Sequence, residues 1–204
     1  MARMDGDEPQ LPADRSLPPG QHLVAEPPVM HYGPLPRETG RAWTFTIGGA
    51  TASGEETILS LAEVLECEPL AFAADMHCGT HWSALDQHWR GVSAADLVQL
   101  APPAPDARSA LVFAEYGYAT NVHLDDLVSP RSVLATHWNG APLSVERGAP
   151  LRLVIPQLYT WKGPKWVRGW NYLTHEAQHL GFWEERGYHL RGDAWREQRF
   201  SHQD

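Results

Sequence analysis

Residues 73–92 read Ala-Ala-Asp-Met-His-Cys-Gly-Thr-His-Trp-Ser-Ala-Leu-Asp-Gln-His-Trp-Arg-Gly-Val, and the rest of the chain is organised around this stretch. The apolar run at residues 70–74 predicts a buried strand, so Cys78 stands where a strand gives way to a glycine-containing loop. A thiol at such a position is held by a rigid element and is still reachable. The nearby histidines and arginine favour its thiolate form, which binds metals or attacks electrophiles. The alternative is a small buried apolar side chain, a frequent role of free cysteine.

The composition is that of one globular domain, or of one domain with arms. The chain has 204 residues, of which 43% are hydrophobic and 20% are charged, and nine of them are tryptophan. This composition supports a sizeable core and excludes an intrinsically disordered chain. The formal net charge of −9 argues against general binding to nucleic acid.

The sequence also predicts the compartment. No segment approaches the roughly 18 uninterrupted apolar residues of a membrane span, and the N-terminus has neither a basic, apolar signal nor twin arginines. We therefore expect a cytoplasmic protein that does not associate with a membrane. Its two cysteines, Cys67 and Cys78, cannot build a disulfide framework and would stay reduced there. Cys67 has no basic neighbour, and we expect it to be structural.

A second stretch, residues 147–170, concentrates positive charge. It holds five basic residues and no acidic residue, although the chain as a whole is acidic. Arginine offers bidentate hydrogen bonds, lysine a point charge, and glycine exposed backbone N–H groups. The stretch therefore suits a phosphate or another anion, with a solvated basic surface as the alternative.

Local patterns predict short helices and strands. Alternation at residues 43–47 predicts a half-buried strand, and a helix is expected to start at Ser53 or Thr57 and to end at Pro69. The apolar face of that helix would consist of Ile58, Leu61, Ala62 and Leu65.

Other elements follow from capping and turn residues. Ser93 is placed to cap a helix that runs through Leu100, and residues 109–115 predict a strand. Asn139-Gly140 predicts a tight hairpin turn, because both residues tolerate positive φ. The first 36 residues are rich in proline and predict an extended arm.

The motif Met-His-Cys-Gly-Thr-His-Trp-Ser-Ala-Leu-Asp at residues 76–86 is followed by Trp-Arg-Gly-Val at residues 89–92. Together they resemble the cysteine loop of the sulfite oxidase family of molybdopterin-dependent enzymes. The resemblance implies that Cys78 is the protein ligand to molybdenum. The role is chemically coherent, because a thiolate suits a soft, high-valent metal that already binds two pterin sulfurs. The charge of the metal keeps such a ligand deprotonated.

Two further motifs carry the same resemblance. Residues 29–36 resemble the family segment that passes the cofactor, and residues 147–167 resemble the segment that wraps the pterin and its phosphate. Arg147 departs from the family pattern, which often has asparagine or another polar residue there. The cofactor-binding positions that the resemblance implies are His31, Tyr32, Arg147, Arg152, Gly163, Pro164 and Lys165.

The resemblance implies an α+β fold of mixed-strand sheets and short helices, as in the sulfite oxidase catalytic domain. Residues 1–28 would form an extended proline-rich arm, residues 29–181 the molybdopterin-binding domain, and residues 182–204 a C-terminal arm docked on it. Such a tail resembles that of the bacterial, cytoplasmic sulfite-oxidase-like branch, which consists of the catalytic domain only.

The implied function is two-electron oxygen-atom transfer on a small substrate, with Tyr118 and His81 lining the substrate pocket. Animal-type sulfite oxidases carry arginines shortly after the cysteine, where this chain has His81 and Trp82. A neutral sulfur or nitrogen oxide is therefore preferred to sulfite. No haem, flavin or iron–sulfur motif is present, so electrons would be exchanged with a separate protein or a diffusible carrier.

Two alternatives remain. His175-Glu176-Ala177-Gln178-His179 matches the His-Glu-x-x-His pattern of zinc-dependent hydrolases. Those enzymes place the motif on a long helix and add a third ligand, and neither feature is evident here. The second alternative is a non-catalytic domain that binds a cofactor or an anion.

Overall fold

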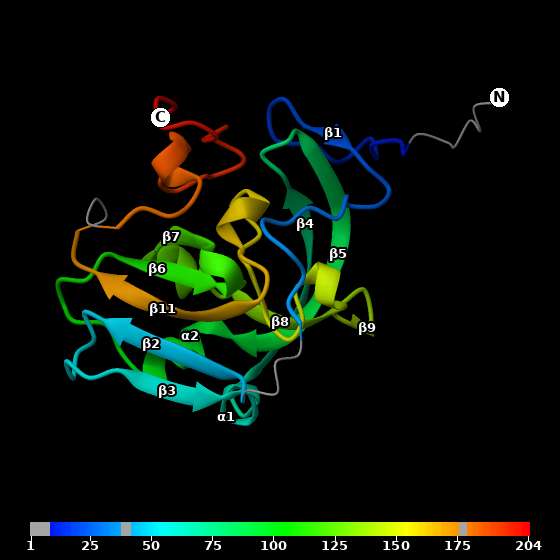
Figure 1. Ribbon diagram of the computed structural model, residues 1–204. Coiled ribbons are helices and arrows are strands. Elements are labelled where there is room, and N and C mark those ends of the chain that lie inside the picture. Colours follow the sequence, from blue (N-terminus) through cyan, green and yellow to red (C-terminus); the bar gives the residue numbers. More distant parts are fainter. Residues whose placement is uncertain (1–8, 38–41, 176–178) are drawn as a thin grey trace.

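The computed structural model describes residues 9–37, 42–175 and 179–204. In this part of the chain the strands form two sheets (Figure 1). The 6-stranded sheet contains β1 (His22–Leu23), β4 (Pro69–His77), β5 (Trp82–Ser93), β8 (Val133–Trp138), β9 (Ala141–Pro142) and β10 (Arg152–Val154). The 5-stranded sheet contains β2 (Thr44–Gly49), β3 (Thr57–Ser60), β6 (Ser109–Ala114), β7 (Ala119–His123) and β11 (Val167–Leu173).

The helices are short. The α-helices are α1 (Leu61–Leu65), α2 (Ala94–Leu100) and α3 (Leu124–Leu127). The 3₁₀ helices are η1 (Glu115–Gly117), η2 (Val145–Arg147), η3 (Thr160–Lys162) and η5 (Glu184–Arg186). Within the described residues, no helix is long and apolar enough to cross a bilayer.

Both sheets mix parallel and antiparallel pairs. The first has the order β1-β5-β8-β10, with β4 paired to β5 and β9 paired to β8, and β1 is parallel to β5. The second has the order β3-β2-β11-β6-β7, in which β11 is parallel to β2 and antiparallel to β6. The expected α+β fold of mixed-strand sheets with short helices is confirmed.

The prediction that a helix starts at Ser53 or Thr57 is wrong. Thr57–Ser60 forms β3, which pairs antiparallel with β2, and the helix starts only at Leu61. Ser60 caps it, because its Oγ accepts from the Glu63 backbone and the Glu63 carboxylate accepts from the Ser60 backbone. The expected apolar face is not buried either, since Ile58 is 60% exposed and Leu65 is 47% exposed.

Other local predictions agree with the structure. The helix from Ser93 to Leu100 exists as α2, although the Ser93 side chain makes no capping hydrogen bond. The strand expected at residues 109–115 is β6, one residue shorter. Asn139 and Gly140 have φ of 49° and 82°, so the predicted hairpin turn has both central residues in the left-handed region.

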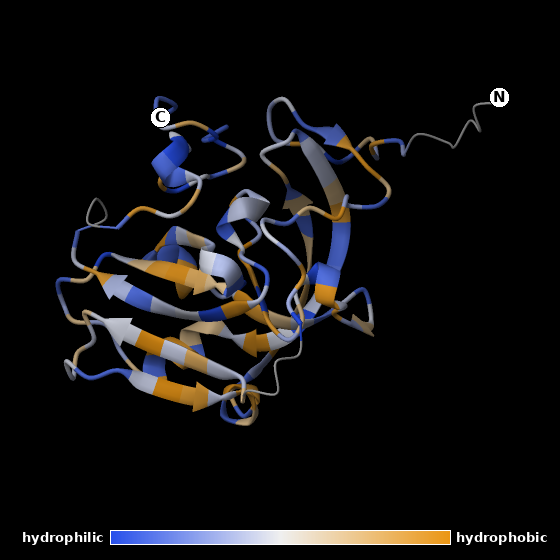
Figure 2. Cartoon of the chain, viewed as in Figure 1, coloured by the Kyte–Doolittle hydropathy of each residue, from blue (hydrophilic) through white to orange (hydrophobic). Residues whose placement is uncertain are grey.

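The buried residues form two apolar clusters. The larger cluster lies around Phe45, Leu97 and Trp170 and includes Cys67, as expected for a structural thiol. The smaller cluster contains Cys78, Trp82 and other residues of the first sheet. Figure 2 shows apolar residues concentrated on the strands, whereas η5, the short helix near the C-terminus, is hydrophilic.

The proline-rich arm is fastened to the first sheet. Strand β1 pairs with β5, and Arg15 donates to the Asp75 carboxylate at 2.8 Å. Gln21 Nε2 donates to the Cys78 carbonyl at 3.0 Å. The arm thus helps to fix the backbone of the predicted metal ligand.

Candidate functional site

The chain forms an open cavity of about 400 Å³, and most of the residues singled out from the sequence line it. The lining comes from the turn after β4, from the arm at residues 27–32, and from η3 and the turn that follows it. Residues of η2, β10 and the C-terminal segment complete it. The predicted site residues that it contains are Cys78, Tyr118, His31, Tyr32, Arg147, Arg152, Gly163, Pro164 and Lys165. Residues up to 134 positions apart in sequence therefore meet in one place, from His31 to Lys165.

Cys78 sits on a tightly bonded turn between β4 and β5. Its N–H donates to the Trp82 carbonyl at 2.9 Å, and its carbonyl accepts from the His81 N–H at 3.0 Å. The residue is only 9% exposed, yet it lines the cavity. The Thr80 hydroxyl donates to the Cys78 sulfur at 3.2 Å, which stabilises negative charge on that sulfur. Thr80 was not among the site residues predicted from the sequence, although its hydroxyl stands only two residues after the cysteine in the motif.

His81 does not reach the cavity, contrary to the expectation that it lines the substrate pocket. Its backbone has φ of 73°, and its Nδ1 forms a hydrogen bond with the Gly20 carbonyl at 2.9 Å. The left-handed backbone turns the imidazole toward the N-terminal arm, so it is not among the lining residues. Thr80 and Trp82, its two neighbours, line the cavity instead.

Three cations, Arg147, Arg152 and Lys165, line the cavity, and no acidic residue lines it within the described part of the chain. Arg152, on β10, is 7% exposed, and its Nε has no hydrogen-bond partner among the protein atoms. Arg147 donates to the Pro27 carbonyl at 2.8 Å. Lys165 donates to the carbonyls of Met30 and Glu146 at 2.7 and 2.6 Å. The carboxylate of Glu146 interacts with Lys165 from outside the described lining.

Burial and mutual repulsion shift the pKa values of this cluster. Burial, followed by the charge of Arg147, lowers the pKa of Arg152 to about 10. Burial, followed by the charges of Arg152 and Arg147, lowers the pKa of Lys165 to about 7. An anion placed among these side chains would relieve both effects. The cluster is therefore suited to a phosphate group.

The low pKa of Lys165 predicts a pH-dependent stability of the cofactor-free protein. The folded-state pKa is about 7 and the ordinary value is 10.5, so between these values the unfolded chain binds more protons than the folded one. The free energy of unfolding should therefore rise with pH from about 7 to 10.5. Chemical denaturation at several pH values should show this rise in the wild type and a smaller one in Lys165→Met. Equal pH dependence of the two proteins would contradict the prediction.

Aromatic side chains form the remaining wall. Tyr118 donates its hydroxyl to the Trp161 carbonyl at 2.6 Å, and burial, then the charge of Glu184, raise its pKa. Trp161 and Trp183 both pack against Tyr188, with ring centroids 5.0 Å apart in each pair. All four residues line the cavity. The aromatic C-terminal tail, expected from the sequence to dock on the domain, contributes Trp183 and Tyr188 to this wall.

Lys162, part of the basic stretch, does not belong to the cation cluster of the cavity. Its side chain is fully buried and forms an ion pair with Glu184. The neighbouring Gly163 passes close to β10, where an added Cβ would lie 2.4 Å from the Leu153 carbonyl oxygen. The glycine therefore lets the backbone of the Gly163-Pro164-Lys165 turn pack directly against β10.

The zinc-hydrolase motif does not lie on a helix in the part that the structure describes. His175 and His179 are in bends after the end of β11, and Glu176 lies outside the described residues. Among the residues that are described, no group of three or more His, Cys, Asp or Glu side chains could hold a metal ion.

The residues present fit the molybdenum cofactor. Cys78 offers one sulfur ligand on a fixed turn, and the orphaned Arg152 Nε and its two cationic neighbours offer charge-assisted hydrogen bonds to a phosphate. The aromatic wall and the Gly163 turn line the same cavity. The thiol and the cations therefore belong to one cavity, as a cofactor with both a dithiolene and a phosphate requires.

Comparison with known proteins gives the same result. Residues 32–183 match the family described as the oxidoreductase molybdopterin binding domain. The uncharacterized oxidoreductase YuiH of Bacillus subtilis (strain 168) is 40% identical over 91% of this chain and 92% of its own length. The catalytic subunit MsrP of a protein-methionine-sulfoxide reductase from Gluconobacter oxydans (strain 621H) is 31% identical over 50% of this chain, but the match spans only 38% of that relative.

A solved structure is similar in fold. The sulfane dehydrogenase SoxCD from Paracoccus pantotrophus superposes with a TM-score of 0.63 at 17% identity, over 71% of this chain and 41% of that one. The chain therefore belongs to the oxidoreductase molybdopterin binding domain family, the sulfite-oxidase-like enzymes that bind a molybdenum cofactor.

Proposed function

We propose that the protein transfers an oxygen atom in a two-electron reaction on a small, neutral sulfur or nitrogen oxide. The observation that carries the proposal is that the Cys78 thiol, the three cations and the aromatic wall share one cavity of about 400 Å³. The sulfoxide reductase named among the relatives supports a sulfur oxide as substrate.

Each end of the cavity has its own role in this proposal. Cys78 would ligate molybdenum, with Thr80 donating to its sulfur. Arg147, Arg152 and Lys165 would bind the phosphate of the pterin, and the bound cofactor would supply the oxygen-atom transfer chemistry. The remaining cofactor contacts would come from His31, Tyr32, Gly163 and Pro164.

The substrate would lie against the aromatic wall. Trp161, Trp183 and Tyr188 offer apolar contact, and Tyr118 offers a hydroxyl that now donates to a backbone carbonyl. In this proposal Arg147, Arg152 and Lys165 bind the phosphate, and the described lining holds no further arginine or lysine for a dianion such as sulfite. A neutral oxide fits this wall better.

Electrons would arrive from a separate protein or a diffusible carrier. The cytoplasmic location and the absence of haem and flavin remain predictions from the sequence. The second candidate, a zinc hydrolase, has no supporting geometry among the described residues.

The test is metal analysis combined with turnover. Protein made in cells that synthesise the cofactor should carry about one molybdenum and one pterin per chain. With a reduced viologen dye as electron donor, it should reduce L-methionine sulfoxide, dimethyl sulfoxide or trimethylamine N-oxide. Protein from cells that cannot make the cofactor is the matched control. Stoichiometric zinc without molybdenum, or sulfite oxidation far above reduction of every oxide, would overturn the proposal.

A further inference from the structure

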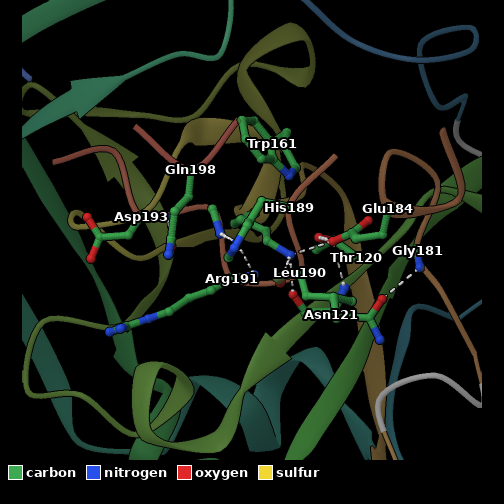
Figure 3. Close-up of polar contacts among 12 residues, drawn as sticks. Thr120, Asn121, Trp161, Gly181, Glu184, His189, Leu190, Arg191, Asp193 and Gln198 are labelled. Atoms are coloured by element: carbon green, nitrogen blue, oxygen red, sulfur yellow. Dashed lines mark hydrogen bonds and ion pairs between the residues drawn. The ribbon is translucent and has the colours of Figure 1, made fainter. Parts of the chain in front are cut away.

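A buried ion pair lies directly behind the aromatic wall. Lys162 Nζ is 2.5 Å from Glu184 Oε1, and the two side chains are 0% and 1% exposed. The ammonium also donates to the Asn121 carbonyl at 2.7 Å and to the Leu190 carbonyl. The pair therefore connects η3, β7 and the C-terminal segment (Figure 3).

Glu184 is bonded to β7 as well as to Lys162. Its Oε1 accepts from the Thr120 hydroxyl at 2.6 Å and from the Asn121 N–H at 3.1 Å. The chain reaches this point through Gly181, where an added Cβ would lie 2.4 Å from the Thr120 Cα and 2.5 Å from Glu184 Oε2. The Gly181 N–H donates to the Asn121 side chain at 2.8 Å (Figure 3). The C-terminal segment is thus attached to β7 at close range.

Residues of the cavity wall are adjacent in sequence to members of this network. Trp161 precedes Lys162, and Trp183 precedes Glu184. Tyr118 lies two residues before Thr120 and donates to the Trp161 carbonyl. The ion pair fixes backbone segments from which the wall side chains project into the cavity.

We propose that Lys162 and Glu184 are a positioning pair that holds the aromatic wall in place and thereby sets the affinity for the oxide substrate. This inference rests on the proposed function of the cavity. Neither side chain of the pair lines the cavity, so the pair acts through Trp161, Trp183 and Tyr188. Glu184 and Tyr188 also lie C-terminal to the residues that match the family.

The chemistry of the pair favours positioning over bulk stability. Two buried charges lose their hydration, and an apolar pair of similar size often stabilises a fold equally well. A charged pair, in contrast, tolerates few alternative placements, because removing either partner leaves a buried charge without compensation. Lys162 and Glu184 therefore restrict the C-terminal segment to one position against β7.

The experiment uses the cofactor-loaded protein and the variant Glu184→Gln, with Glu185→Gln as matched control. Glu185 is adjacent in η5, its side chain is 61% exposed, and its carboxylate lies 3.8 Å from Arg186. For L-methionine sulfoxide with reduced viologen dye, KM should rise about tenfold to a hundredfold in Glu184→Gln, as expected for a misplaced wall. The kcat and the molybdenum content should change little, and Glu185→Gln should behave as wild type.

A second readout needs no activity. Trypsin should cleave after Arg186 or Arg191 faster in Glu184→Gln than in wild type, because the C-terminal segment is released from β7. The variant Tyr188→Leu removes one wall ring without touching the ion pair, and it should raise KM in the same way. If Glu184→Gln does not fold, an unchanged KM in Tyr188→Leu overturns the inference, because the pair is proposed to act through this wall.

The outcomes are distinguishable. Wild-type protein that contains molybdenum but reduces no oxide would refute the proposed function, and the trypsin comparison would still report whether the pair holds the C-terminal segment. Normal turnover by the wild type, with KM unchanged in the Glu184 and Tyr188 variants, would overturn the inference. Lower thermal stability of Glu184→Gln with unchanged KM would show a purely structural pair, which also overturns it.

Discussion

Replacing Cys78 with serine is expected to abolish reduction of L-methionine sulfoxide while the protein still folds. The substitution removes the one sulfur ligand that the cavity lining offers within the described residues, apart from the thioethers of Met30 and Met76. A hydroxyl is a much poorer ligand for a soft metal. The loss should exceed the roughly 10- to 100-fold that follows from changing an outer-shell partner of a metal site.

The fold should tolerate this change because the turn is held by its backbone. The Cys78 N–H and carbonyl are bonded to Trp82, His81 and Gln21, and none of these bonds involves the sulfur. Circular dichroism and the denaturation midpoint should therefore be close to wild type, while turnover and molybdenum content are measured on the same samples.

Cys67→Ser is the matched control for this prediction. Cys67 is also 9% exposed, but it packs in the larger core cluster and does not line the cavity. Its serine variant should keep turnover and molybdenum, with some loss of stability because a hydroxyl is buried among apolar groups. Full activity of Cys78→Ser would contradict the assignment of the ligand.

Features that depend on neighbouring residues could be predicted from the sequence. The turn at Asn139-Gly140 needs positive φ at both positions, and asparagine and glycine are residue types that tolerate it. The position of Cys78 just after β4 followed from an apolar run that leads into a glycine-containing loop. Arg152, Lys165 and His31 meet in one cavity although they lie far apart in the sequence. Their meeting could be predicted only through the family resemblance.

Features set by tertiary contacts could not be predicted. The sequence of residues 57–60 favours the start of a helix, but these residues form a strand because they pair with β2. His81 leaves the cavity because its backbone has φ of 73°, which no pattern in the motif indicated. Lys162 and Glu184 are 22 positions apart and form a buried bond. From the sequence, the charge of Lys162 was therefore counted with the stretch expected to bind an anion.

Replacing Arg152 with methionine is expected to lower cofactor occupancy without destabilising the cofactor-free fold. Methionine keeps an unbranched side chain against the Trp89 ring, 5.4 Å from the Arg152 guanidinium carbon, and removes the charge. A charge-assisted hydrogen bond contributes about 1.5 to 3 kcal/mol. Its loss should weaken binding of the cofactor about 10- to 100-fold, since 1.4 kcal/mol corresponds to tenfold.

Unlike cofactor occupancy, the stability of cofactor-free Arg152→Met should not fall. Burial and the charge of Arg147 lower the pKa of Arg152 to about 10, which shows that the empty cavity disfavours its charged form. Removing that charge should leave the free energy of unfolding unchanged or raise it, with the lost cation–π contact as the opposing contribution.

The control is Arg168→Met, which removes a cation that is paired with Glu115 and does not line the cavity. Molybdenum and pterin per chain, measured after extensive dialysis, should fall in the Arg152 variant only. Denaturation of the cofactor-free proteins gives the stability comparison. If occupancy and stability of Arg152→Met fell together, the arginine would be a structural residue of β10. Only a fall in occupancy at equal or higher stability identifies it as a ligand for the phosphate.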